Sequence, residues 1–220
     1  MNNSDYWKAN LIKWENRRYS ELAALNPFSI PLRKRMESCR RLLEELALSL
    51  GSKEIKIIEF GCGSGLLAKQ IKVIGITCIY QGYDLSQEGI LKAKARNLGS
   101  GFSFDVLDLT QPSLHFDSDI SIFLGLSDWL SLEENKTLFG SIHSKYYIWS
   151  YTLKTKGELE NTSYSVFRRL RNKKGMKSLS WTQDEVNQLF QKCDLQRQRP
   201  DQKFSFGPGY ISCLTPKEKY

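Results

Sequence analysis

The sequence is poor in residues that build disulfide frameworks and metal clusters. Its five cysteines are scattered over 220 residues, are odd in number and show no CxxC pair. We therefore expect small buried thiols in a reducing compartment, and neither disulfides nor a zinc site. The two histidines, His115 and His143, are expected in a loop and at a helix end, and we interpret both as surface or capping residues rather than bases. No metal site is predicted.

Long apolar runs are also missing. No stretch is long enough to cross a bilayer, and the N-terminal residues MNNSDYWKANLIKW lack the apolar core of a signal peptide. These absences favour a cytoplasmic protein without a membrane span. There is no internal repeat and no low-complexity linker, so the length fits one domain with a sizeable core.

The chain carries a net charge of +8, which favours an anionic partner. Nucleic acid, a phosphorylated metabolite and a lipid surface all meet that description. Charge alone does not choose among them.

The order of apolar patterns predicts an α/β protein. Residues 5–24 and 32–50 have helical spacing, and NPFSIP separates them. From residue 55 strands and helices alternate, which predicts a parallel sheet covered on both faces. The expected strands are 55–60, 77–85, 102–109, 118–126 and 145–152, and the helices between them are 64–75, 87–98 and 131–144.

The C-terminal region breaks this alternation. A helix over 181–193 begins with a capping box formed by Thr182 and Glu185. Residues 194–200 and 203–215 then follow as two strands with a short connection, which requires an antiparallel pair.

The stretch KIIEFGCGSGLLAKQI holds the main functional signal. Gly61, Gly63 and Gly65 follow the first strand, at the sheet edge where open α/β folds bind ligands. Glycines allow a sharp turn and close approach of a ligand, although they also serve as plain turn residues. Leu66 stands where a dinucleotide-binding turn usually has its third glycine, which disfavours an NAD-type oxidoreductase.

Three carboxylates accompany the turn. Glu59 precedes Gly61 by two residues and suits a cationic ligand better than a pyrophosphate. Asp84 ends the second strand, where it can accept two ribose hydroxyls. Asp108 closes the third strand, where it can receive an adenine amino group. For both aspartates, a simple helix cap is the alternative.

The segments EFGCGSG, GYDLS and VLDLT resemble, in order and spacing, the first three motifs of the class I S-adenosylmethionine-dependent methyltransferases. The resemblance covers residue 55 to the C-terminus. It implies a Rossmann-like, doubly wound α/β fold, with a mostly parallel seven-stranded sheet, an antiparallel last strand and an N-terminal helical lid. Residues 1–50 would form the lid and 51–220 the S-adenosylmethionine-binding part of one structural domain. The family's helix between strands three and four is expected to be short or missing, because only TQPSLHFDSD stands there.

The resemblance also implies S-adenosyl-L-methionine as cofactor, and roles for individual residues. Glu59 would order the turn and the methionyl amino end, the three glycines would contact the methionyl part and ribose, and Asp84 would hold the ribose hydroxyls. Further implied cofactor-binding residues are Leu85, Asp108 and Leu109 around the adenine and Leu124 and Gly125 on the methionyl side. From the lid, Tyr19, Arg33 or Arg35 would meet the methionyl carboxylate, unless they only belong to a solvated basic helix face.

The methyl acceptor is less defined. Methyl transfer relies largely on proximity, so no catalytic residue need be visible, and none is assigned. Candidate acceptor-binding residues are Asp128, Trp129, Tyr151 and Arg168. Residues 153–180 mix basic and aromatic side chains, which indicates either a phosphate-bearing acceptor or a solvated loop. We expect a small or medium acceptor methylated on oxygen or nitrogen. The alternatives are an RNA methyltransferase, which the charge favours, and a methyltransferase-like binding protein without activity; the oligomeric state is not predicted.

Overall fold

The computed structural model describes residues 3–22, 26, 29–51, 54–111, 114–154, 179–203 and 209–217. Its strands are β1 (Ile55–Phe60), β2 (Cys78–Asp84), β3 (Phe102–Val106), β4 (Phe116–Leu124), β5 (Ile142–Thr152), β6 (Leu195–Arg197), β7 (Gln202–Lys203) and β8 (Gly209–Pro216). Its helices are α1 (Asn3–Tyr19), α2 (Ile30–Leu50), α3 (Leu66–Ile74), α4 (Gln87–Ala95), the short 3-10 helix η3 (Ser127–Trp129), α5 (Leu132–Gly140) and α7 (Gln183–Lys192).

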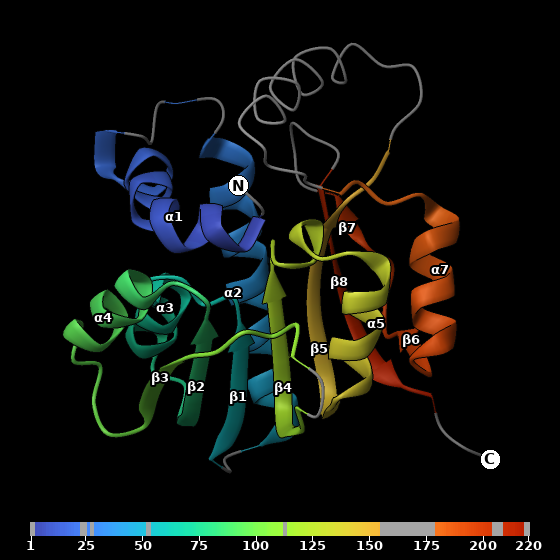
Figure 1. The fold of residues 1–220 in the computed structure, drawn as a ribbon. Coiled ribbons are helices and arrows are strands. Elements are labelled where there is room, and N and C mark those ends of the chain that lie inside the picture. The colour runs from blue at the N-terminus through green and yellow to red at the C-terminus, as the bar shows by residue number, and fades with distance from the viewer. Residues whose placement is uncertain are drawn as a thin grey trace.

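One sheet runs through the centre of the molecule with helices on both sides (Figure 1). Seven strands follow the hydrogen-bonded order β3-β2-β1-β4-β5-β8-β6. The first five are parallel, whereas β8 runs antiparallel to β5 and to β6. The predicted mostly parallel sheet with an antiparallel last strand is therefore confirmed. The return from β6 to β8 also contains the two-residue β7, which pairs with β8.

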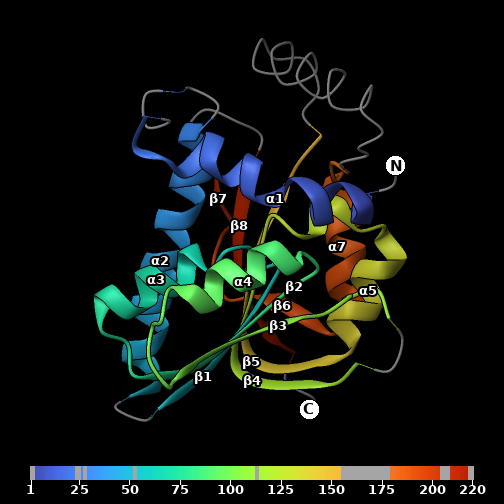
Figure 2. The ribbon, with the colours of Figure 1, turned by 60° about the vertical axis from the view of Figure 1, so that its left-hand side comes forward.

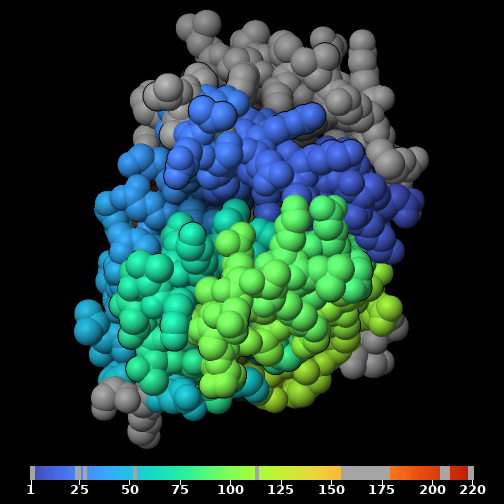
Figure 3. Space-filling model, turned by 90° about the vertical axis from the view of Figure 1, so that its left-hand side faces the viewer, coloured from blue at the N-terminus to red at the C-terminus, as the bar shows by residue number. Residues whose placement is uncertain are grey.

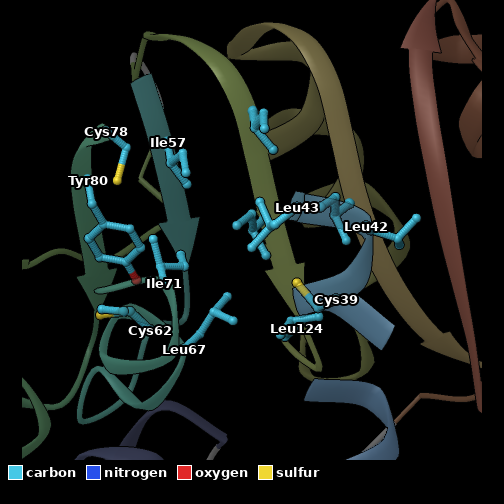
Figure 4. Close-up of a cluster of buried hydrophobic side chains, with 14 of the residues drawn as sticks. Cys39, Leu42, Leu43, Ile57, Cys62, Leu67, Ile71, Cys78, Tyr80 and Leu124 are labelled. Carbon is cyan, nitrogen blue, oxygen red and sulfur yellow. The ribbon is translucent and has the colours of Figure 1, made fainter. Parts of the chain in front are cut away.

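Two apolar cores lie on the two faces of the sheet. On one face α2, α3 and α4 pack against β1, β2 and β4. Figure 4 shows this core: Cys39 and Leu43 of α2 lie against Leu124 of β4, while Ile71 of α3 lies close to Ile57 of β1. On the other face α5 and α7 enclose aromatic side chains, among them Trp149. The central strand β1 is buried on both faces except at Lys56, as its mostly apolar sequence predicts.

The capping chemistry explains where two helices start. Ser131 and Glu134 form a reciprocal capping box at α5, and Thr182 and Glu185 form the predicted one at α7. Each box satisfies amide groups that have no partner within the helix.

Several predicted boundaries are wrong. The α-helix expected through residue 24 ends at Tyr19, and the strand expected through residue 109 ends at Val106. The helix expected through residue 144 ends at Gly140, and β5 begins at Ile142. Ile142 pairs with Phe116 of β4 and is buried, so sheet pairing overrides the local helical pattern. His143 consequently lies in a strand and not at a helix end. The expectation of a missing helix before β4 holds for the described residues 107–111 and 114–115, none of which is helical.

The N-terminal helix α1 lies above the tips of the parallel strands in Figure 1 and packs against α4. Figure 2 shows it crossing that end of the molecule, and in the space-filling view of Figure 3 its blue surface borders the green surface around α4. The five cysteines are free thiols, four of them buried. Across the described ranges, no helix combines the length and apolar character needed to cross a membrane.

Candidate cofactor site

The glycine turn connects β1 to α3 in a conformation that favours glycine. Gly61 and Gly63 have φ angles of 78° and 56°, in the left-handed region. The Gly61 and Cys62 amides donate to the Tyr83 carbonyl of β2, at 2.7 and 3.0 Å. These bonds fix the turn at the carboxyl edge of the sheet, where its sequence position predicts it.

Asp84 links the end of β2 to this turn. Its carboxylate accepts hydrogen bonds from the Gly63 amide and from the Ser86 amide, each at 2.8 Å. Burial raises the pKa of Asp84 to about 6, and the two amide bonds oppose that shift. The N-cap of α4 is Ser86, whose hydroxyl accepts from the Gly89 amide, so Asp84 is not that helix's cap. Each carboxylate oxygen retains acceptor capacity for a ligand hydroxyl.

Glu59 lies in β1 beneath the turn and is 3% exposed. It accepts a short hydrogen bond from the Tyr80 hydroxyl of β2. Burial raises the pKa of Glu59 to about 8, and the carboxylates of Asp84 and Glu15 push in the same direction. The Tyr80 bond and the Arg35 guanidinium oppose this shift. The carboxyl therefore holds its proton near neutral pH unless a cation joins it.

Glu15 of α1 is a site residue that the sequence analysis did not identify. Its side chain is buried, and Oε1 accepts a hydrogen bond from the Ser64 amide at 3.0 Å. It lies so close to the turn that a Cβ on Gly63 would overlap it. A signal was present in the sequence: Glu15 follows Leu11 by four residues and Ile12 by three, which places an acid on the apolar face of a basic helix.

Tyr19 and Arg35 come together beside these acids. Burial raises the pKa of Tyr19, whereas the Arg35 guanidinium, which hydrogen-bonds to the Tyr19 side chain, lowers it. Arg35 also covers Gly125, where a Cβ would overlap its guanidinium. The Arg35 Nε is buried and has no hydrogen-bond partner among the described residues, so this cation has a donor to spare. Arg33 instead donates to the Ser20 carbonyl at 2.6 Å.

The remaining cofactor candidates line the same edge of the sheet. Leu124 ends β4 in the core, and the Gly125 amide donates to the Ser150 hydroxyl at 2.8 Å. Leu85 follows β2 and is half-buried. Asp108 is half-buried and accepts from the Thr110 amide and hydroxyl, at 3.0 and 2.7 Å. The chain before it is tied to β2, because the Leu107 amide donates to the Asp84 carbonyl at 3.0 Å, and Leu109 beside it is buried.

Trp129 belongs to an aromatic cluster that joins η3 to α1. Its ring contacts the Trp7 ring edge-to-face, with centroids 4.8 Å apart, and Trp7 in turn contacts Trp14 and Tyr6. The Asn3 side chain donates to the Trp129 carbonyl at 3.0 Å. This cluster borders the strand end at which Gly125 follows β4.

The other acceptor candidates are placed differently. The Asp128 carboxylate accepts from the Thr152 amide and hydroxyl, at 3.2 and 2.8 Å, and so connects η3 to β5. Tyr151 is buried, stacks on Trp149 with centroids 4.3 Å apart, and donates to Asp201 at 2.7 Å. Both side chains are engaged within the protein. Arg168 lies outside the described residues, as do residues 155–178.

The geometry fits a ligand with cationic, anionic and hydroxyl groups together. Glu59 and Glu15 can face a cation, Arg35 an anion, and Asp84 a pair of hydroxyls. The missing Cβ atoms at the positive-φ residues Gly63 and Gly125 allow Glu15 and Arg35 to approach the backbone closely. S-adenosylmethionine carries each of these groups, and the residues present fit it.

Comparisons with known proteins bear on the fold. No family model and no curated protein sequence matches this chain. Among solved structures, magnesium protoporphyrin IX methyltransferase from Synechocystis with bound S-adenosylhomocysteine matches with a TM-score of 0.73 at 16% identity, over 97% of this chain and 98% of that one. The same enzyme with bound S-adenosylmethionine also gives 0.73, at 13% identity over 99% and 98%.

A third match is an S-adenosylmethionine-dependent methyltransferase from Clostridium acetobutylicum, with a TM-score of 0.63 at 9% identity over 96% and 99%. The likeness extends over nearly the whole length of all three chains. The protein described here therefore has the Rossmann-like fold of the S-adenosylmethionine-dependent methyltransferases.

Proposed function

We propose that this protein is a class I methyltransferase that uses S-adenosyl-L-methionine to methylate oxygen or nitrogen of a small or medium acceptor. The observation that supports this most is the junction of the glycine turn with Asp84, at 2.8 Å from the Gly63 amide. This hydrogen bond places the Asp84 carboxylate, which can accept from a ligand hydroxyl, directly beside the glycine turn. The location is proposed to be cytoplasmic.

The cofactor roles divide among six side chains. Asp84 would accept the ribose hydroxyls, with Leu85 beside the adenine and Asp108 at its amino group. Glu59 would orient the cofactor's amino group through the turn, and Arg35, with Tyr19, would bind its carboxylate. The buried Arg35 Nε without a partner supports this assignment, because a buried donor left unsatisfied costs about 1–3 kcal/mol.

The bound cofactor supplies a methyl group on a positively charged sulfur. The protein's own contribution is to hold the acceptor in line with that group and to exclude water. We propose that residues 1–50 form a lid and that α1 is the part that covers the cofactor, because Glu15 holds α1 against the turn. In this account no side chain needs to act as a base, and none is assigned.

The acceptor would lie beside the contact between α1 and η3. The edge-to-face pair of Trp7 and Trp129 offers an apolar wall there, which suits an acceptor with a flat ring. The net charge of +8 supports an acceptor that also carries phosphate or carboxylate. The Synechocystis enzyme is named for magnesium protoporphyrin IX, and the present chain can be assayed with that compound as acceptor.

An RNA methyltransferase is the second candidate, and the same charge favours it. Binding to mixed RNA that weakens steeply with salt would support RNA as acceptor, because phosphate contacts release counterions. Binding without turnover over a broad acceptor panel would instead favour a non-catalytic binding protein.

The first test of the proposed function is calorimetry with S-adenosylhomocysteine and with NAD. We expect S-adenosylhomocysteine to bind and NAD not to bind. Binding of NAD alone would overturn the proposal.

A further inference from the structure

The only two histidines of the chain lie side by side, far from the glycine turn. His115 directly precedes β4, and His143 is the second residue of β5. Their ring centres are 5.2 Å apart with planes inclined by 52°, so they converge without stacking. Both histidines lie at the amino ends of parallel strands, whereas the glycine turn lies at the carboxyl end of β1. The nine residues of β4 span about 30 Å at about 3.3 Å per residue, which separates the pair from the proposed cofactor site.

Asp117 completes a group of three. It pairs with His143 across the parallel β4–β5 ladder and stands two residues after His115. Side chains two residues apart in an extended chain share one face, and partners in register project from the same face of the sheet. The three exposed side chains therefore meet, and their ligand atoms lie within 4.8 Å of one another.

The spacing suits a transition-metal ion. The distance between His115 Nε2 and Asp117 Oδ2 is 3.6 Å. Two ligand atoms at about 2.0–2.1 Å from one tetrahedral zinc ion are about 3.3–3.4 Å apart, so small side-chain rotations suffice. Imidazole nitrogens with one carboxylate form a common zinc ligand set that leaves a fourth position for water.

We propose that His115, Asp117 and His143 form a binding site for a divalent transition-metal ion of the zinc class. The site rests on these residues alone and is independent of the proposed methyl transfer. The bound ion ties the chain entering β4, which is not helical in its described residues, to the start of β5. An ion that binds only the folded protein also stabilises it by mass action.

The test is a zinc titration of untagged, chelator-stripped protein in competition with a chromophoric chelator. We expect one ion per chain. His115→Ala and His143→Ala should each weaken binding by on the order of tenfold to a hundredfold, the range for disturbed metal sites. Because the chain has no further histidine, no neighbouring imidazole can substitute for the one removed.

Two control variants separate this site from adventitious binding. Cys193→Ser removes the one cysteine that is not buried, and Asp105→Asn removes an exposed carboxylate on β3; both should bind zinc like the parent chain. Bound cobalt should show the visible bands of a tetrahedral nitrogen–oxygen site without thiolate charge-transfer absorption. Circular dichroism checks that each variant is folded.

Three results would overturn the proposal. One is a stoichiometry well below one ion per chain. The second is unchanged affinity in both histidine variants, and the third is loss of binding in Cys193→Ser. The proposal is supported if the parent chain and both controls bind one ion per chain and only the histidine variants lose zinc affinity.

Discussion

The Glu15 carboxylate accepts a hydrogen bond from the Ser64 amide, 49 residues further along the chain, at 3.0 Å. This bond fastens α1 to the turn that precedes α3. The partial positive charge of the free amides at the start of a helix strengthens such a contact. In the proposed function, α1 would thereby cover a ligand bound at the turn.

Replacing Glu15 by Ala should loosen that cover. A hydrogen bond to a charged group contributes about 1.5–3 kcal/mol, so dissociation of S-adenosylhomocysteine should become on the order of tenfold faster. Stopped-flow fluorescence of the α1 tryptophans provides the measurement. Asn16→Ala, an exposed change on the same helix, is the matched control. Equal dissociation rates in both variants would contradict a lid role for α1.

Gly63→Ala should be costly for two reasons. The residue has φ of 56°, and a Cβ would overlap the Glu15 carboxylate. The left-handed conformation alone costs an L-residue about 1–2 kcal/mol. Gly75→Ala shows the cost of this strain alone, since Gly75 has φ of 75° and no described residue outside its chain neighbours comes within 4 Å of its Cβ position.

Urea unfolding of these variants should show a larger loss of stability for Gly63→Ala than for Gly75→Ala. The additional loss in Gly63→Ala should be smaller when Glu15 is also replaced by Ala, because the overlap with its carboxylate is then removed. An excess that persists in the double variant would show that the contact between Glu15 and Gly63 is not its cause.

Glu59 makes the stability of the protein depend on pH. Its pKa is raised from 4.5 to about 8 in the folded state, so the folded protein keeps a proton that the unfolded chain loses at lower pH. The free energy of unfolding should therefore be highest below about pH 4.5, as far as this group is concerned, and fall as pH rises to about 8. Each pKa unit corresponds to about 1.4 kcal/mol, so the fall should reach a few kcal/mol.

Glu59→Gln removes this titration while keeping the shape of the side chain. Between pH 5.5 and 8.5 its unfolding free energy, measured with urea, should fall less than that of the parent chain. Glu88→Gln, at an exposed carboxylate of α4, should behave like the parent. Parallel pH profiles for Glu59→Gln and the parent would refute the buried, protonated carboxyl.

Local patterns in the sequence predict most of the fold. The run Ile55–Phe60 is apolar apart from Lys56 and Glu59 and stops at Gly61, and β1 has the predicted bounds. The capping box of Thr182 and Glu185 likewise marks the start of α7 within a few residues. Such signals lie in consecutive residues and need no knowledge of tertiary contacts.

The wrong predictions and the site residue that the sequence did not reveal depend on contacts between residues far apart in the chain. Residues 142–144 read as helix, but the pairing of Ile142 with Phe116 makes them a strand. Tyr151 stands at a strand end near the predicted crevice, yet its hydroxyl bonds to Asp201, 50 residues away. Glu15 reaches the turn only because α1 folds back over it. The spacing of neighbouring residues does not encode these distant partners.

The central claim is that Asp84 and the glycine turn hold the ribose of S-adenosylmethionine. Calorimetric titration of S-adenosylhomocysteine into the parent chain, Asp84→Ala and the exposed control Asp105→Ala tests it directly. Because a charge-assisted hydrogen bond contributes about 1.5–3 kcal/mol, the account predicts affinity weakened by on the order of tenfold or more in Asp84→Ala and unchanged in Asp105→Ala. Equal affinity in folded Asp84→Ala and the parent chain would contradict it.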